Sequence, residues 1–409
     1  MKDEKKAPKL RFKGFTDDWE ERKLKDVLDI SKTKNKAQQY GKVDVLSVSR
    51  EVGTVNQIKY QGRSFAGSDL SNYKVVQGGE LIYTKSPLKG APYGIFQVAT
   101  IKGIISPLYA VYTSTDKAYT PFVATALKND NIATHYLAPL VTKGAKNTIN
   151  VTDEGALEGK LQFPSILEQK QIFIFFKQLD DTIALHQRKL DLLKEQKKGY
   201  LQKMFPKNGA KVPELRFAGF ADEWEERKLS EGTSKIGDGL HGTPNYSDNG
   251  DVFFINGNNL VNGKIVITKE TKLVAESNQS KDDKLLNMDT ILMSINGTIG
   301  NLAWYNNERV MLGKSVAYLT VSNFDKKFIF SYLQTSTIKN YFLNNLTGTT
   351  IKNLGLKTIR DTTLFVPTLE EQQQIGEFFW ILEETIALHQ RKLDLLKEQK
   401  KGFLQKMFV

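Results

Sequence analysis

Glycine-rich stretches give the closest matches to motifs of known chemistry. Residues 237–242, GDGLHG, fit the G-x-G-x-x-G pattern of dinucleotide-binding loops. That pattern works when a strand precedes it and a helix follows it, because the pyrophosphate binds to the N–H groups that begin the helix. Thr243, Pro244 and Asn245 follow here, and they predict a turn instead. We therefore expect no dinucleotide site at this position.

Motifs for phosphate binding, metal binding and methyl transfer are incomplete. Gly313-Lys314-Ser315 resembles the end of a Walker A loop, but Glu308 stands where that loop needs its first glycine. The chain has no cysteine and only 4 histidines, so we expect no metal site. It also lacks the N-P-P-[FY] or D-P-P-[FY] tetrapeptide that amino-methyltransferases use around a flipped adenine. The sequence predicts a non-catalytic chain without a cofactor of its own.

Polar loop residues in the second half of the chain are candidates for recognition. Residues 237–260 concentrate glycine, asparagine, histidine and tyrosine around a short apolar strand expected at 252–255. Loops on a rigid scaffold often carry recognition, and asparagine can pair with adenine in the major groove. For any single residue, a purely structural turn is an equally good interpretation. The DNA-binding candidates here are Asp238, His241, Thr243 and Tyr246.

Two later segments extend this candidate surface. Residues 294–319 alternate apolar runs with turns, and residues 346–359, LTGTTIKNLGLKTI, predict a glycine turn that leads into a short helix. The exposed N–H groups at the start of such a helix would favour phosphate. The candidates in the two segments are Asn296, Thr298, Lys314, Ser315, Thr349, Thr350, Lys352 and Asn353.

The first half offers parallel candidates. Residues 141–157 occupy the place of 346–359, with Asn150 aligned to Asn353, and residues 83–94, YTKSPLKGAPYG, add further cations. Lysine contacts to phosphate position a protein on DNA, whereas base contacts specify sequence, and the residue types alone do not separate the two roles. Scattered lysines are also compatible with ordinary solvated surface. The candidates are Lys85, Ser86, Lys89, Lys143, Lys146, Asn147 and Asn150.

Internal repeats place these segments in two halves. Residues 182–205 return at 385–408 with one difference over 24 positions, Tyr200 against Phe403. The opening segment 8–24 also returns, at 213–229, with 13 of 17 positions identical. The stretches between the repeats, roughly 30–150 and 232–352, show little kinship. The repeated segments therefore predict a common frame that holds two different readers.

Each repeat that ends a half predicts a long helix with a heptad seam. Ser165 with Glu168, and Thr368 with Glu371, fit a capping box in which hydroxyl and carboxylate satisfy N–H groups reciprocally. Apolar residues then recur at alternating steps of four and three, which is typical of a coiled coil. The predicted seam comprises Ile172, Phe176, Leu179, Ile183, Leu190 and Leu193, and their counterparts Ile375, Phe379, Leu382, Ile386, Leu393 and Leu396.

We expect the two helices to pair with each other, because a narrow apolar stripe must be buried and the other copy is self-complementary. A helix over 166–205 would be about 60 Å long, so the pair could act as a ruler. His186, Lys197, His389 and Lys400 interrupt the seam; they would set its register or reach out to water. The alternative is that each helix packs on its own domain.

The whole-chain composition is that of a globular protein with a polyanionic partner. A length of 409 residues favours two or more domains. The net charge of +12 favours nucleic acid, although a merely basic protein would also carry it. No apolar run approaches the roughly 18 residues that a membrane span needs. Without cysteine or a signal-like N-terminus, we expect a cytoplasmic protein.

The repeated segments LRFxGFxxxWEERKL and LHQRKLDLLKEQKKGxLQKMF, together with IGDGLHGTPNY at 236–246, resemble the specificity (S) subunit of type I restriction-modification systems. The resemblance covers essentially the whole chain. It implies an α+β fold: two α/β target-recognition domains in tandem, separated and joined by two long helices in an antiparallel intramolecular coiled coil with a pseudo-two-fold axis. The implied segments are domains at 1–163 and 207–366 and spacer helices at 164–206 and 367–409.

The resemblance also implies a function. Each domain would read one half of a bipartite, asymmetric site on double-stranded DNA, while the coiled coil fixes the spacing and docks two modification (methyltransferase) subunits. Those partners methylate adenine with S-adenosylmethionine, and restriction subunits add cleavage that requires ATP and Mg²⁺. No short tandem insertion marks the central helix, so the spacer length stays open. The rival hypotheses are a coiled-coil assembly scaffold without sequence readout and an autonomous nuclease or methyltransferase.

Overall fold

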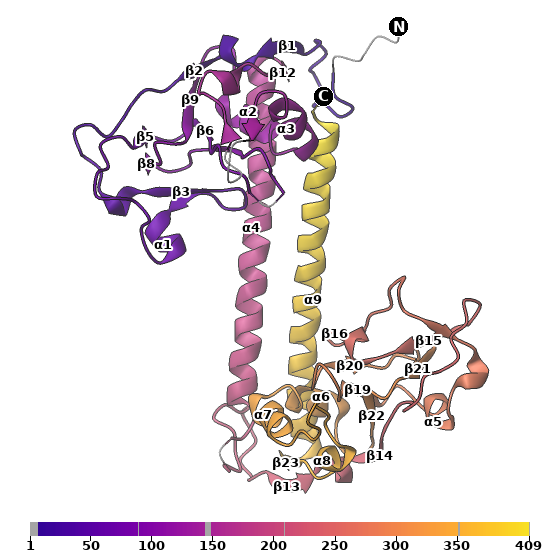
Figure 1. Ribbon diagram of the computed structural model, residues 1–409. Coiled ribbons are helices and arrows are strands. Elements are labelled where there is room, and N and C mark those ends of the chain that lie inside the picture. The colour runs from indigo at the N-terminus through magenta and orange to yellow at the C-terminus, as the bar shows by residue number, and fades with distance from the viewer. Residues whose placement is uncertain (1–6, 89, 144–148, 208, 351, 409) are drawn as a thin grey trace. The chain divides into compact units, whose positions relative to one another are not determined.

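The computed structural model describes residues 7–88, 90–143, 149–207, 209–350 and 352–408. Contacts divide the chain into two compact units: a first unit of residues 1–187 with 392–409, and a second unit of residues 188–391. Helix α4 (Ile166–Lys203) and helix α9 (Leu369–Lys406) each contribute one part to each unit. Both helices lie within the segments predicted as spacer helices, and Figure 1 labels them.

The first unit is built on a four-stranded antiparallel sheet in the order β2-β9-β6-β7. Strand β12 pairs with β1, and smaller pairs surround the sheet. The strands are β1 (Glu20–Lys23), β2 (Leu28–Ile30), β3 (Leu46–Ser49), β4 (Gly53–Asn56), β5 (Lys74–Val76), β6 (Leu81–Tyr83), β7 (Phe96–Val98), β8 (Gly103–Ile105), β9 (Ala110–Ser114), β10 (Thr142–Lys143), β11 (Ile149–Asn150) and β12 (Lys160–Phe163). The short helices are α1 (Gln57–Gln61), α2 (Thr120–Ala126) and α3 (Asp130–Leu137).

The second unit has a four-stranded antiparallel sheet in the order β14-β22-β19-β20 and a smaller sheet, β18-β15-β21. Its strands are β13 (Glu225–Lys228), β14 (Thr233–Asp238), β15 (Val252–Ile255), β16 (Leu260–Val261), β17 (Lys264–Ile265), β18 (Leu273–Val274), β19 (Thr290–Ser294), β20 (Leu302–Trp304), β21 (Val310–Leu312), β22 (Val316–Val321) and β23 (Thr363–Val366). Its short helices are α5 (Lys281–Lys284), α6 (Lys326–Tyr332), α7 (Ser336–Asn344) and α8 (Leu356–Arg360). The strand expected at 252–255 is confirmed as β15, and the short helix expected after residue 353 is confirmed as α8.

The two units share more than their repeated segments. In each, the first ribbon pairs the opening repeat with the strand before the long helix: β1 with β12, and β13 with β23. The four-stranded sheets then follow the same chain order. Their central strands β6 and β19 are buried throughout, so a strand there needs only apolar residues of suitable size, which many sequences supply. The common frame therefore extends into the regions whose sequences show little kinship.

The repeated tryptophan anchors the end of a long helix in each unit. Trp19 packs edge-on against Phe122 at 5.9 Å between ring centroids and against Phe408, just beyond α9, at 6.3 Å. Trp224 packs in the same way against Phe328 at 5.8 Å and against Phe205, just beyond α4, at 6.4 Å. The two indole rings are only 1% and 2% exposed. Each unit thus completes its core with a helix end from the other repeat.

The helix starts differ from the predicted capping box in one respect. The Ser165 hydroxyl accepts a hydrogen bond from the Glu168 N–H at 3.4 Å, as expected. The Glu168 carboxylate, however, accepts two hydrogen bonds of 2.7 Å from the Arg11 guanidinium. The reciprocal half of the predicted box is therefore wrong, because a buried carboxylate is stabilised more by a bidentate guanidinium than by one N–H group.

The second unit repeats this arrangement. Arg216 donates to both oxygens of Glu371 at 2.6 and 2.7 Å, while Thr368 accepts from the Glu371 N–H at 3.4 Å. Both glutamates are fully buried, so each guanidinium neutralises a charge that water does not reach. The arginine of the repeated LRF sequence therefore ties the opening segment to the start of the long helix.

The predicted pairing of the two helices is confirmed within each unit. In the first unit, Phe175 of α4 lies 5.0 Å from Phe403 of α9 between ring centroids, and Lys400 forms an ion pair with Asp180. In the second unit, Tyr200 of α4 lies 5.0 Å from Phe378, and Lys197 forms a 2.7 Å ion pair with Glu383. The early part of one helix thus meets the late part of the other, which makes the pairing antiparallel.

The predicted seam is buried to different degrees along its length. Ile172 and Phe176 belong to the same core cluster as Trp19, so this end of α4 packs on its own domain as well as on α9. Pairing with the other helix and packing on its own domain, the two predicted alternatives, therefore both occur at this helix end. Lys197 and Lys400 bind carboxylates across the pair instead of reaching water. The buried seam positions are Ile172, Phe176, Leu190, Leu193, Ile375, Phe379, Leu393 and Leu396, and the half-buried ones are Leu179, Ile183, Leu382 and Ile386.

We predict that Arg11→Met lowers the free energy of unfolding by about 3 kcal/mol, because it leaves the Glu168 carboxylate buried and unpaired. The double variant Arg11→Met/Glu168→Leu should recover most of that loss, because an apolar pair needs no counter-charge. Urea denaturation followed by circular dichroism measures both. As a control, Lys211→Met removes an exposed ion pair with Glu223 and should change little. Equal losses for the single and double variants would contradict this account.

Candidate nucleic-acid interface

In the second unit, several predicted segments meet at one end of the four-stranded sheet. Strands β14 and β19 end there and β22 begins there, because Asp238 pairs with Ala317 and Ser294 pairs with Val316. The Leu240 N–H donates to the Leu312 carbonyl at 2.8 Å, which joins the first loop to the end of β21, directly before the loop that leads into β22. We call residues 238–241, 295–298, 313–315, 347–350 and 352–353 the loop cluster.

Backbone hydrogen bonds connect the other members of the loop cluster. The Ile295 N–H donates to the Ser315 carbonyl at 2.9 Å, and the Leu354 N–H donates to the Ile295 carbonyl at 2.8 Å. Asn296 forms a β-bridge with Asn353, which exchanges two backbone hydrogen bonds with Thr347. The structure therefore brings together ten predicted residues from segments that lie far apart in sequence. They are Asp238, His241, Asn296, Thr298, Lys314, Ser315, Thr349, Thr350, Lys352 and Asn353.

The side chains of the loop cluster are mostly open to solvent. His241 is exposed, and its Nε2 lies 2.8 Å from the Asp238 carboxylate, which holds the imidazole in place. Five further candidates at this end of the sheet are also exposed, whereas four are half-buried. The exposed ones are Thr298, Lys314, Thr349, Thr350 and Lys352, and the half-buried ones are Asp238, Asn296, Ser315 and Asn353.

Two candidates from the first loop lie elsewhere. Tyr246 forms a β-bridge with Val274 of β18, and its ring packs edge-on against Phe254 at 5.9 Å. Thr243 lies in the exposed turn that leads there. The predicted segment 237–260 thus divides between the loop cluster and the smaller sheet.

Asn256 is a member of this site that the sequence analysis missed. It follows directly after β15, and its Oδ1 accepts a hydrogen bond from the Ser315 hydroxyl at 3.1 Å. The Ser315 oxygen in turn accepts from the Gly257 N–H at 2.9 Å. A Cβ on Gly313 would lie 2.3 Å from the Asn256 Oδ1, so this contact requires glycine. The sequence feature that could have indicated Asn256 is its position immediately after a strand of apolar residues.

In the first unit, Lys85 follows directly after β6 but is held by a carboxylate. Its ammonium pairs with Asp153, which also binds the Lys74 ammonium at 2.5 Å. Burial alone would raise the pKa of the Asp153 carboxyl, but the hydrogen bonds from the two lysines outweigh it and lower that pKa. Lys85 also has a positive φ of 51°. It therefore fastens the segment around Asp153 to the sheet.

The proposed alignment of Asn150 with Asn353 agrees with their pairing. Asn150 lies exposed on β11 opposite Thr142, as Asn353 lies opposite Thr347. The two threonine hydroxyls lie 3.5 and 3.2 Å from the carbonyls of their asparagine partners. Ser86 is half-buried beside the turn of the β6–β7 loop. Lys89, Lys146 and Asn147 lie outside the described residues, as does the side chain of Lys143.

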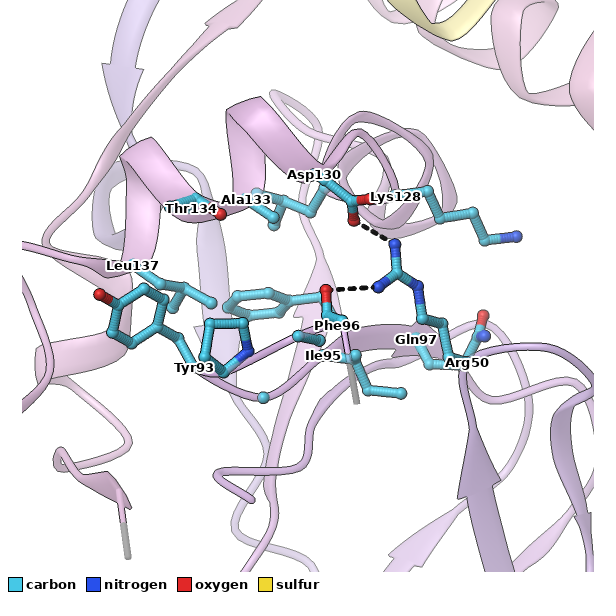
Figure 2. Close-up of a pocket in the computed structure, with 15 residues that line it drawn as sticks. Arg50, Tyr93, Ile95, Phe96, Gln97, Lys128, Asp130, Ala133, Thr134 and Leu137 are labelled. Carbon is cyan, nitrogen blue, oxygen red and sulfur yellow. Dashed lines mark hydrogen bonds and ion pairs between the residues drawn. The ribbon is translucent and has the colours of Figure 1, made fainter. Parts of the chain in front are cut away.

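Contacts around a small pocket hold the β6–β7 loop in place (Figure 2). Arg50, from the turn between β3 and β4, donates to the Gly90 carbonyl at 2.8 Å and forms an ion pair with Asp130 of α3. Apolar side chains, including Phe96 and Leu137, line the pocket. The sequence analysis missed Arg50, which joins the hairpin, the loop and α3.

The geometry defines a tandem pair of α+β domains suited to recognition, each built on its own four-stranded sheet with exposed loops beyond the strand ends. Known proteins agree with this class. The sequence matches the type I restriction modification DNA specificity domain twice, at residues 16–195 and 221–398. Because the two matches cover most of the chain, it belongs to this family of specificity subunits. It recognises DNA sequence with two copies of the domain and is non-catalytic, since catalysis lies in partner subunits of such systems.

Individual relatives span the whole chain at low identity. The MjaX type I restriction enzyme specificity subunit of Methanocaldococcus jannaschii is 21% identical over 444 residues, which cover 98% of this chain and 95% of that protein. The solved S subunit of a type I system from M. genitalium matches with a TM-score of 0.64 at 15% identity, over 98% and 99% of the two chains. A chain from a structure of type I complex assembly matches with a TM-score of 0.51 at 16% identity, over 96% and 98%.

The described residues contain neither a membrane-spanning helix nor a cluster of metal ligands. Over those residues, no helix is both long and apolar enough to cross a membrane. Within the same part of the chain, no three histidine, cysteine, aspartate or glutamate residues gather as metal ligands would.

We predict that Asp153→Asn lowers the free energy of unfolding by about 2 kcal/mol at neutral pH, because Lys74 and Lys85 lose their counter-charge. A lowered pKa stabilises the fold above the ordinary value of 3.8, and this contribution disappears as the pH falls through the lowered pKa. The difference from wild type should therefore shrink below about pH 4. Thermal unfolding across pH measures it, with the exposed neighbour Glu154→Gln as control. A difference independent of pH would contradict the ion-pair interpretation.

Proposed function

We propose that each unit reads one half of a bipartite, asymmetric site on double-stranded DNA. The observation that carries this proposal is the pair of equivalent sheets with unlike loops at the same end. The loop cluster presents the Asp238–His241 pair with Asn296 and Asn353. In the first unit, Ser86 follows shortly after the equivalent strand β6, and Asn150 lies exposed on β11. Because equivalent strands are followed by different side chains in the two units, the two half-sites would differ in sequence.

Charge and residue type support duplex DNA as the partner. The net charge of +12 supplies the neutralisation of phosphates that dominates affinity for DNA. Asparagine can bond to both N6 and N7 of adenine, so Asn296 and Asn353 suit base readout, whereas exposed Lys314 and Lys352 suit phosphates. The helix pair would set the separation of the two half-sites, since α4 and α9 are 38-residue helices that each contribute to both units.

Equivalent exposed leucines on the two long helices support a contact with two copies of one protein partner. Leu185 and Leu192 of α4 are exposed by 60% and 52%, and their repeats Leu388 and Leu395 of α9 by 64% and 47%. Exposed leucines that recur identically indicate a contact made twice. We assign them to two modification subunits, which would bring S-adenosylmethionine and methylate adenine. Restriction subunits would add cleavage dependent on ATP and Mg²⁺ in the full complex.

Methylation mapping tests the two-reader proposal. The chain is expressed with its modification subunit, and methylated adenines are located by long-read sequencing of the host DNA. We predict a split motif in the wild type, and for Asn296→Ala a change or relaxation of bases in one half of that motif only. A motif altered in both halves, or methylation without any motif, would contradict the proposal. Methylation without any motif would instead favour an assembly scaffold, which would not bind one DNA sequence more tightly than another.

The variant Lys352→Ala tests the proposed phosphate contacts separately. We predict that Lys352→Ala weakens duplex binding and makes the plot of log affinity against log salt shallower by about 0.9, the contribution of one released counterion. Fluorescence anisotropy over a range of salt concentrations measures both quantities. The control is Lys177→Ala, which removes a lysine that pairs with Asp181 on the surface of α4. An unchanged slope for Lys352→Ala would remove this residue from the interface.

A further inference from the structure

A basic and aromatic segment of the first unit lies outside every loop discussed so far. No acidic residue occurs between Glu51 and Asp69, while the short stretch KYQGRSF at 59–65 carries two cations and two aromatic rings. In the structure this stretch includes the end of α1 and the turn after it. We call residues 59–65 the α1 turn.

The α1 turn is held in a defined conformation by its neighbours. Asn56 caps α1, since its Oδ1 accepts from the Lys59 N–H at 3.0 Å and its Nδ2 donates to the Val43 carbonyl at 2.6 Å. Gly62 ends α1 with a φ of +76°, a conformation that favours glycine. The Gln57 Oε1 then accepts from the Phe65 N–H at 2.8 Å. A segment fixed by this many local bonds presents its side chains at a small entropic cost.

Its large side chains nevertheless point outward. Tyr60 is 54% exposed and Phe65 is 59% exposed, and Lys59 and Arg63 are exposed beside them. The Arg63 guanidinium lies 4.7 Å from the centre of the Phe65 ring. Two exposed aromatic rings on an ordered turn bury little of their surface in the fold, so they contribute little to its stability. This pattern is typical of a contact surface.

The β3–β4 hairpin lies between the α1 turn and the β6–β7 loop and contacts both. Arg50 at the hairpin turn contacts Gly90 of that loop, whereas α1 follows from the opposite, open end of the hairpin. Figure 1 shows α1 beside β3 in the same unit. The ladder has four residue pairs and is therefore about 10–13 Å long, which separates the start of α1 from the hairpin turn. On DNA this corresponds to about three to four nucleotides along one strand.

We propose that the α1 turn is a second DNA contact of the first unit, flanking the bases read by the sheet-end loops. Lys59 and Arg63 pair with phosphates, and the rings of Tyr60 and Phe65 pack against sugars and bases at the groove edge. A local run of cations without any carboxylate matches a polyanion better than it matches a typical protein surface of mixed charge. This inference rests on the proposed function, because it assumes that the first unit binds DNA.

Binding of the full chain to a 40-base-pair random-sequence duplex tests the inference. We expect Arg63→Ala and Lys59→Ala each to make the salt slope shallower by about 0.9. Phe65→Ala should instead weaken binding about fivefold to tenfold with the slope unchanged, because it removes an apolar contact at the groove edge and no charge. Phe65→Trp should keep the affinity, since it retains an aromatic face.

Matched controls separate these effects from surface changes in general. Leu108→Ala shortens an apolar side chain that is 74% exposed in the same unit. Lys160→Ala removes a lysine of β12 that forms an ion pair with Glu21 of β1. Both should bind DNA as the wild type does. Circular dichroism verifies that every variant is folded, so a loss of binding reports the contact.

The outcomes distinguish this inference from the proposed function. If Lys352→Ala weakens binding while Arg63→Ala and Phe65→Ala bind like the wild type, the α1 turn is not a DNA contact and the proposed function stands. If the α1-turn variants keep DNA binding but lose association with the modification subunit, the turn docks a protein and the inference is wrong. If the wild type itself binds no duplex, both proposals fail.

Discussion

The antiparallel pairing of two nearly identical helices is the interaction on which the rest of the structure depends. The late part of α9 packs in the first unit, where Phe408 lies against Trp19, and the late part of α4 packs in the second, where Phe205 lies against Trp224. Neither core is complete without a segment that the other repeat supplies. The cross-helix ion pairs Lys400–Asp180 and Lys197–Glu383 join the same surfaces. Because each helix must fit the other, a change in one copy would require a matching change in its partner.

The same constraint explains why the rest of the chain is free to differ. Positions that meet another repeated segment are tied to it, as Arg11 is to Glu168 and Arg216 to Glu371. The strands between the repeats need only bury apolar residues, and the loops at the sheet ends need only remain connected. Such positions can change without disturbing the frame.

Much of the fold could be predicted because its strongest signals are local. The heptad pattern and the capping residues of each helix are visible within some 40 residues, and the near-identical second copy supplies a partner, so the helices and their pairing followed from the sequence. The capping prediction failed in part because Arg11 competes for the Glu168 carboxylate from 157 positions away. The equivalence of the two sheets was hidden because unlike apolar sequences form equally good buried strands. Long-range partners and packing, which single-sequence patterns do not encode, account for the rest.

The candidate site was less predictable for the same reason. The grouping of Asp238, Asn296 and Asn353 arises from strand ends that meet only in the folded sheet. Lys85 has the sequence signature of an exposed cation, yet Asp153, 68 residues later, holds it. Asn256 and Arg50 resemble ordinary polar loop residues until their partners Ser315 and Gly90 are in place. Residue types indicate which side chains could bind DNA, whereas the tertiary contacts decide which of them are already engaged.

Cysteine crosslinking tests the helix pairing most directly, because the natural chain has no cysteine. The double variant Asp180→Cys/Lys400→Cys places one thiol on each helix at an observed cross-helix contact. The variant Asp180→Cys/Glu383→Cys joins repeat-equivalent positions that would meet only in a parallel pair. With a short bismaleimide, the account predicts an intramolecular crosslink in monomeric chains of the first variant and none in the second. A crosslink in the second variant, or in neither, would contradict it.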